Sequence, residues 1–429
     1  MEYIGNIQEK RGIKFYKSDI ISIIIVLLTL SSLFIKLGLS FFSYIDEGFA
    51  LIGIVMIFFG IINNRYNKID VSLFILIIGI VAIGVISNYI YGYQIDKKII
   101  MLDILATTKG FIYYLAFRSL KMDNETIKRT IKRSSYLLFV YMLILLPFCI
   151  LNFFVNIGMS SDIVFGIKGF KFIYVGEGEY SLPFYVIVFV GFLNFSLNNQ
   201  ETLCSNRTKY YNIIYFFLSV FLWLASLRSR AITFSIFAIF LYFALYKVKK
   251  SDNMKHVFII ILIGLIIAYI FGNDKLSYYF GNTNMARYNL LYYGFYSAGR
   301  FFPFGSGFAT YGSDLAAEYY SPLYYEYGFN SIYGLEENRH MFANDGLWGE
   351  IFGQFGFFGA ISFILIIILI FKECYYKNTT KYSKIPVLYL FSILIIGSLG
   401  SKTFLHYSII PVFALLAIFS NFYLEKNEV

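Results

Sequence analysis

Residues 71–91 read VSLFILIIGIVAIGVISNYIY, an apolar run without a charged residue. A helix of this length is about 30 Å long, which matches the hydrocarbon core of a membrane. Similar runs recur along the chain, for example at 20–35 and 360–371. The sequence therefore predicts an integral membrane protein built from helices.

The composition supports the same fold class. Hydrophobic residues make up 58% of the 429 residues and charged residues only 14%, whereas soluble domains have about 45–50% and about 25%. The first apolar run follows Lys10, Arg11, Lys14 and Lys17 and resembles a signal peptide. It has no small-residue cleavage site, so we expect it to be retained.

Apolar runs and their breaks predict an all-α polytopic protein of about twelve transmembrane helices, at 19–38, 46–62, 70–91, 99–117, 134–157, 181–198, 210–227, 231–247, 256–272, 346–371, 385–400 and 404–424. Each short loop on the side of the termini carries at least two basic residues, and loop 118–133 carries six. Because cytoplasmic loops are rich in Lys and Arg, both termini are predicted to be cytoplasmic. The net charge of +10 then reflects topology, and no nucleic acid is expected as a partner.

The connection from Gly272 to Asp345 is the longest, with more than 70 residues, and it is predicted to lie outside the cell. It contains thirteen tyrosines, whereas disordered segments are poor in aromatic residues. We therefore expect a folded extracytoplasmic subdomain with short helices at 273–345, between transmembrane bundles at 1–272 and 346–429.

Two arginines lie where the topology rule disfavours them. Residues 224–231 read LASLRSRA, which places Arg228 and Arg230 in a short hairpin at the outer membrane interface. An arginine at the centre of the bilayer costs about 2.5–3.5 kcal/mol, and outer loops are otherwise poor in it. Since guanidinium groups bind phosphate oxygens in a bidentate way, these two residues predict a phosphate site. The alternative is that they extend toward lipid phosphates at the interface.

The large loop adds Arg287 and Arg300, thirteen residues apart on an expected helix rich in tyrosine. The loop has seven acidic and four basic residues, so these arginines do not form a general basic surface. Tyrosine rings present an apolar face and a hydroxyl, which suits a sugar. We expect both arginines to face one cavity that binds a phosphate-linked glycan, although an aromatic belt at the interface also accounts for tyrosines.

Two further segments of the loop are candidate site elements. Residues 303–308 read PFGSGF, and their glycines allow a backbone to approach a ligand closely. Residues 339–346 read RHMFANDG, in which His340 and Asp345 are the candidates for a general base. His340 is alternatively a surface residue, and Asp345 a cap of the next helix.

Charged residues near the spans offer two more pairs. Asp103 and Lys109 are candidates for buried partners within one helix, and Lys402 and His406 lie near the outer ends of the last two spans. Either pair could line the site. No His or Cys cluster has the spacing of metal ligands, so neither a metal nor a cofactor is expected.

These features together resemble the O-antigen and capsule repeat-unit polymerases, a superfamily that also contains the O-antigen ligases. The resemblance rests on the architecture, the arginine hairpin, the loop with GRF at 299–301 and PFGSGF at 303–308, and the segments NDGLW at 344–348 and QFGFFG at 354–359. It is clearest from about 222 to 359.

The resemblance implies a GT-C-like, metal-independent membrane glycosyltransferase of the bacterial cytoplasmic membrane. Such an enzyme transfers a glycan from undecaprenyl diphosphate to a sugar hydroxyl of the next lipid-linked unit, at the outer face. Its donor and acceptor are both lipid-linked, and a flippase and a chain-length regulator are possible partners. Outer-face arginines hold the diphosphate in this superfamily, which implies that role for Arg230, Arg287 and Arg300, together with Arg228.

Two other functions stay open from the sequence. An O-antigen ligase would share the diphosphate site but use another acceptor; ligases typically have His followed by Asn, whereas Met341 follows His340 here. A flippase for lipid-linked oligosaccharides also has about twelve spans, but it needs no large outer subdomain. The large loop therefore favours a transferase.

Overall fold

The computed structural model describes residues 16–155, 157–164, 166–198, 206–247, 262, 266, 281–377 and 381–422. Its N-terminal elements are α1 (Lys17–Thr29), α2 (Ser31–Lys36), η1 (Ser40–Tyr44), α3 (Ile45–Ile62), α4 (Lys68–Tyr91), α5 (Lys97–Arg118) and α6 (Asn124–Phe154). The middle holds β1 (Ser160–Val164), β2 (Ile167–Phe170), α7 (Glu177–Ser181), α8 (Pro183–Asn198), α9 (Asn206–Leu224) and α10 (Ser229–Lys247). After the large loop's α12 (Ala286–Arg300), α13 (Asp314–Glu318), α14 (Pro322–Glu326) and η2 (Phe329–Ser331) come α15 (Leu347–Lys377), α16 (Lys381–Ser398) and α17 (Pro411–Ser420).

Six helices within the described residues are long and apolar enough to cross a membrane, and α10, α16 and α17 contribute shorter apolar helices. Side chains on α3 and α4 leave large apolar surfaces uncovered, with Phe58 61% and Ile75 63% exposed. Apolar faces of this extent are covered by lipid in membrane proteins. The chain is therefore an all-α membrane protein, as the sequence predicts. A described helix overlaps every predicted span except 256–272, most of which lies outside the described residues.

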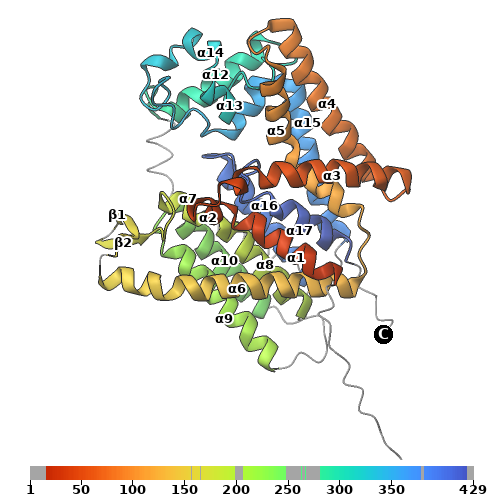
Figure 1. The fold of residues 1–429 in the computed structure, drawn as a ribbon, viewed down its shortest axis with the longest axis vertical. Coiled ribbons are helices and arrows are strands. Elements are labelled where there is room, and N and C mark those ends of the chain that lie inside the picture. The colour runs from red at the N-terminus through yellow and green to blue at the C-terminus, as the bar shows by residue number, and fades with distance from the viewer. Residues whose placement is uncertain are drawn as a thin grey trace, which may run out of the picture.

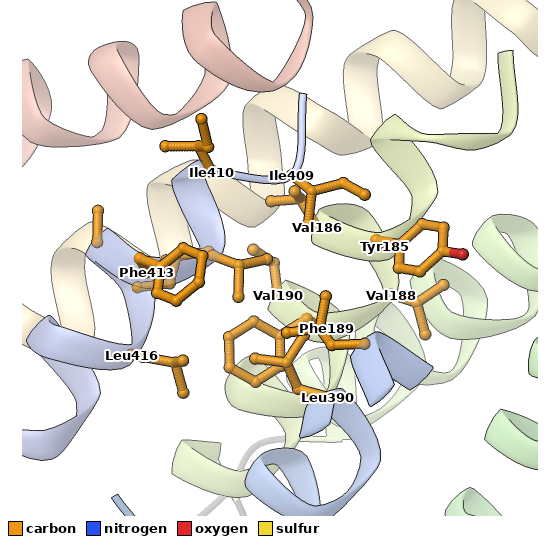
Figure 2. Packing of buried hydrophobic residues seen from close by; sticks show 14 of the residues in the cluster. Tyr185, Val186, Val188, Phe189, Val190, Leu390, Ile409, Ile410, Phe413 and Leu416 are labelled. Carbon is orange, nitrogen blue, oxygen red and sulfur yellow. The ribbon is translucent and has the colours of Figure 1, made fainter. Parts of the chain in front are cut away.

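Helix α8 lies at the centre of the bundle. It packs against α6, α9, α16 and α17, and its residues 183–197 are all buried. A helix that is apolar on every face is covered either by other helices or by lipid, and the burial of α8 shows that other helices cover it. Figure 2 shows Val186 and Phe189 of α8 among side chains from α16 and α17, including Leu390 and Phe413.

The described part of the large loop forms a group of short helices, α12 to α14, at one end of the molecule beside α4 and α15 (Figure 1). It has its own cluster of buried side chains, which includes Tyr311, Tyr324 and Phe329. The rings of Tyr293 and Tyr327 stack with centroids 4.7 Å apart. Four of the loop's described tyrosines are therefore buried in this small core and unavailable to a sugar, whereas others, such as Tyr292 and Tyr333, are more than half exposed.

The glycines at 303–308 serve contacts between helices. Gly305 and Gly307 have positive φ angles of 78° and 99°, a region that favours glycine. The backbone nitrogen of Gly307 donates to the carbonyl of Gln354, at 2.9 Å. A Cβ added to Gly305 would lie 2.3 Å from the backbone nitrogen of Gly356, where α15 departs from helical geometry. These glycines therefore allow the loop to pack closely on α15, and not the approach to a ligand that the sequence suggested.

The only strands in the described residues form an antiparallel hairpin of β1 and β2. The backbone nitrogen of Phe170 in β2 donates to the carbonyl of Ala225, at 2.8 Å. The hairpin is thereby attached to the turn between α9 and α10, and it is followed by α7. These connections bring α7 next to the two arginines of that turn.

Candidate functional site

A pocket of about 270 Å³ lies between the α9–α10 turn, the start of α8 and the connection from α16 to α17. Arg228, Arg230, Lys402, His406 and Asp345 are among its lining residues. Three permanent cations and one carboxylate therefore line a small volume. Arg228 and Lys402 have carboxylate partners outside the lining, so the positive charge available to an anionic ligand rests mainly on Arg230.

The turn between α9 and α10 positions both arginines. Leu227 adopts a positive φ of 52°, and α10 begins two residues later at Ser229. Arg230 lies in the first turn of α10, where the helix dipole adds partial positive charge. Its Nη1 donates to the hydroxyl of Ser401, at 2.5 Å, and this bond ties the guanidinium to the α16–α17 connection.

Arg228 has a fixed partner on the other side of the pocket. Its Nη2 lies 3.2 Å from Oε2 of Glu177, whose side chain is 2% exposed, while that of Arg228 is 46% exposed. The buried carboxylate anchors one edge of the guanidinium. The rest of the half-exposed Arg228 side chain lines the pocket.

Asp345 and Arg287 form an ion pair at the edge of the pocket. Oδ2 of Asp345 accepts from Nε of Arg287 at 2.9 Å and from its Nη2 at 2.5 Å. Their side chains are 24% and 21% exposed, respectively. Two candidate residues from opposite ends of the large loop are thereby brought together.

A groove of about 420 Å³ begins at this same ion pair. Beyond Arg287 and Asp345 its lining is mostly apolar and comes from α12, α15 and the end of α16: Leu291, Phe295, Leu347, Trp348, Phe352 and Leu399. Asp345 lines both the groove and the cationic pocket. The two cavities therefore meet at the carboxylate of Asp345, with charged side chains on one side and apolar side chains on the other.

Arg300 lies away from these cavities. Its Nη1 donates to Oε2 of Glu326 at 2.6 Å, and its Nη2 donates to the hydroxyl of Tyr93 at 3.1 Å. Thirteen residues along a helix correspond to about 20 Å, so Arg287 and Arg300 lie at opposite ends of α12. The expectation that both face one cavity is therefore not met. Arg300 joins the large loop to the end of α4.

His340 also lies outside the linings of the pocket and the groove. Its Nδ1 is 2.7 Å from the carbonyl oxygen of Glu337, within a tight turn closed by a bridge between Glu336 and Arg339. Of the two predicted bases, only Asp345 lines the pocket.

Lys402 was recognised as a candidate from the sequence, but the carboxylates around it were not. Its Nζ lies 2.9 Å from Oε2 of Glu350 and 3.4 Å from Oδ1 of Asp314. The Lys402 ammonium holds the pKa of Asp314 below its usual range. Burial opposes the charge of Lys402, but the two carboxylates raise its pKa above the ordinary value. Lys402 is therefore a fixed cation that joins α13, α15 and the α16–α17 connection. The sequence offered one signal for this cluster, because Glu350 is the single glutamate in the apolar span 346–371.

The pairing proposed for Asp103 and Lys109 is wrong. Nζ of Lys109 contacts a carboxylate oxygen of Asp46 and lies 3.3 Å from Oε1 of Glu47. Oδ2 of Asp103 accepts from the backbone nitrogen of Ala309, at 2.5 Å. The two residues lie six apart on α5, so their side chains point in different directions and find partners on different segments.

Among the described residues, no group of three or more His, Cys, Asp or Glu side chains could hold a metal ion. No protein-family model and no curated protein sequence matches this chain. The candidate site consequently rests on its geometry: a cationic pocket, an apolar groove, and a carboxylate where they meet.

Proposed function

We propose that the protein is a membrane glycosyltransferase that polymerises oligosaccharide units linked to undecaprenyl diphosphate. It acts at the outer face of a bacterial cytoplasmic membrane, with twelve spans and both termini inside. One observation carries the proposal: the cationic pocket and the apolar groove share Asp345. A lipid diphosphate has the same division into an anionic head and a hydrocarbon tail.

In this proposal the pocket binds the diphosphate. Arg230 and Arg228 come from the α9–α10 turn, and Lys402 faces them from the α16–α17 connection. Fixed cations stabilise charge that develops on a leaving group, and they require no reorganisation during the reaction. The apolar groove along α12 and α15 receives the first isoprene units of the lipid.

The transfer is a direct displacement at the anomeric carbon. The acceptor hydroxyl oxygen forms the new glycosidic bond, the bond from the anomeric carbon to the diphosphate oxygen breaks, and the diphosphate leaves with the electron pair. The acceptor proton passes to a base, for which Asp345 is the candidate at the pocket. Arg287 orients that carboxylate. The lipid diphosphate is itself an activated donor, so no nucleotide is needed outside the cell.

The test is reconstitution of the purified full-length chain with lipid-linked repeat units extracted from cells that make the polymer. A ladder of lengthened glycans on the lipid supports the proposal. Transfer to a second lipid core without a ladder would indicate a ligase. Movement of intact lipid-linked units across vesicles, with no new glycosidic bond, would indicate a flippase.

A further inference from the structure

A second pocket, of about 580 Å³, lies at the far end of α15 from the candidate site. It is formed by the α3–α4 and α5–α6 connections, together with the ends of α15 and α17. In Figure 1 the start of α6 lies away from the short helices of the large loop. Its volume is within the range of about 300–1,000 Å³ typical of ligand sites.

The walls of this pocket carry more positive charge than their carboxylates balance. Arg118 is matched, since its guanidinium binds Asp70 at 3.1 Å and Glu373 at 2.9 Å in the buried core. Arg65 donates to the backbone carbonyl of Ser119 at 2.9 Å. Within the described residues, neither Arg65 nor Lys121 forms an ion pair with a carboxylate, yet both line the pocket and are exposed.

An unpaired donor points to a ligand independently of this charge. Oδ1 of Asn421 accepts from Nη1 of Arg118 at 2.5 Å, which fixes the orientation of the amide. Its Nδ2 is buried and has no hydrogen-bond acceptor in the described part of the chain. Buried polar groups are almost always paired. Asn421 lines the pocket, so a small shift of its amide would let Nδ2 donate to an acceptor bound there.

We propose that this pocket binds a phosphate-bearing anion through Arg65, Lys121 and the amide of Asn421. The pocket lies where apolar helices end, at the level of lipid phosphates, so the favoured source is the headgroup of an anionic phospholipid. On the predicted topology this is the cytoplasmic leaflet, which is rich in anionic lipid. The inference uses none of the residues assigned to glycan transfer and stands or falls separately from it.

The test uses purified full-length protein in detergent, titrated with phosphatidylglycerol, with phosphatidylcholine and with inorganic phosphate. Native mass spectrometry counts bound lipid, and thermal unfolding reports stabilisation. A hydrogen bond to a charged group contributes about 1.5 kcal/mol, which is about a tenfold change in affinity. We expect Arg65→Gln with Lys121→Gln to weaken phosphatidylglycerol binding about 100-fold.

Lys68→Gln is the matched control, because Lys68 is exposed at the start of α4 and does not line the pocket. It should bind phosphatidylglycerol like the wild type. A second variant, Asn421→Leu, should also weaken binding, which keeps the test valid if the double variant fails to fold. Equal stabilisation by inorganic phosphate alone would support the anion site and name a soluble source. Unchanged phosphatidylglycerol binding in a folded double variant, or equal binding of phosphatidylcholine, would overturn the proposal.

Discussion

The variant Arg230→Lys tests whether the candidate site requires the forked shape of a guanidinium or only a positive charge. The guanidinium of Arg230 donates to Ser401 from one nitrogen and lines the cationic pocket. It can therefore hold the α16–α17 connection and still present other N–H groups to a phosphate. Lysine has one compact ammonium group and cannot reproduce this forked arrangement.

The expected magnitude follows from that difference. Loss of one donor that stabilises developing negative charge costs about 2.7–4 kcal/mol, or about 100- to 1,000-fold in rate. Lysine retains the positive charge but loses the bidentate geometry, so we expect Arg230→Lys to fall toward the lower end, near 100-fold. Membrane insertion should not change, since topology requires only positive charge.

The assay measures initial rates of glycan elongation with purified variants and lipid-linked repeat units, at equal amounts of folded protein. Arg129→Lys is the matched control, because Arg129 lies on the exposed start of α6 and pairs with Glu125 four residues earlier. It should retain the wild-type rate. If Arg230→Lys elongates as fast as this control, Arg230 is an interfacial anchor and the diphosphate pocket is wrongly placed.

Four other outcomes are expected. Arg300→Lys should keep the elongation rate within about threefold of wild type, because the ion pair of Arg300 with the large loop's glutamate lies outside the pocket. Exposed ion pairs contribute only about 0.2–1 kcal/mol. A loss of rate comparable to that of Arg230→Lys would show that Arg300 belongs to the site. Gly305→Ala should greatly reduce the yield of folded protein by gel filtration, because the new Cβ would lie 2.3 Å from backbone. Arg118→Met should lower the free energy of unfolding by about 3–5 kcal/mol in denaturant titrations, since it removes the ion-pair partner of the buried Asp70 and leaves Glu373 with Lys377 alone. In sealed cells, a membrane-impermeant thiol reagent should label Asn330→Cys and not Glu125→Cys; the reverse result would invert the predicted topology.

Much of the fold could be predicted because membrane helices are encoded locally. An apolar run such as 71–91 specifies a spanning helix without reference to the rest of the chain, and α4 (Lys68–Tyr91) follows it closely. The hairpin at 160–170 was missed, because its strands are short and sit between apolar spans. The break in α15 at Gly356 was missed as well, since it depends on the distant loop at 303–308.

The candidate site was predictable in part. Arginines that oppose the topology rule drew attention to Arg228 and Arg230, and both line the cationic pocket. The carboxylates around Lys402 come from segments about 50 and 90 residues earlier in the sequence. No spacing rule connects residues so far apart, and only the packing of α15 against the α16–α17 connection brings them together.

The two arginines of α12 show why proximity along a chain is a poor guide to a shared site. Both lie on one helix rich in tyrosine, which made a common cavity attractive. A helix is rigid, however, and thirteen residues separate its ends by about 20 Å. Arg287 therefore reaches Asp345 at the cationic pocket, while Arg300 reaches Glu326 and Tyr93 at the other end. If a diphosphate is bound, its oxygens span only a few ångströms, so it contacts the arginines of the α9–α10 turn and cannot extend to Arg300.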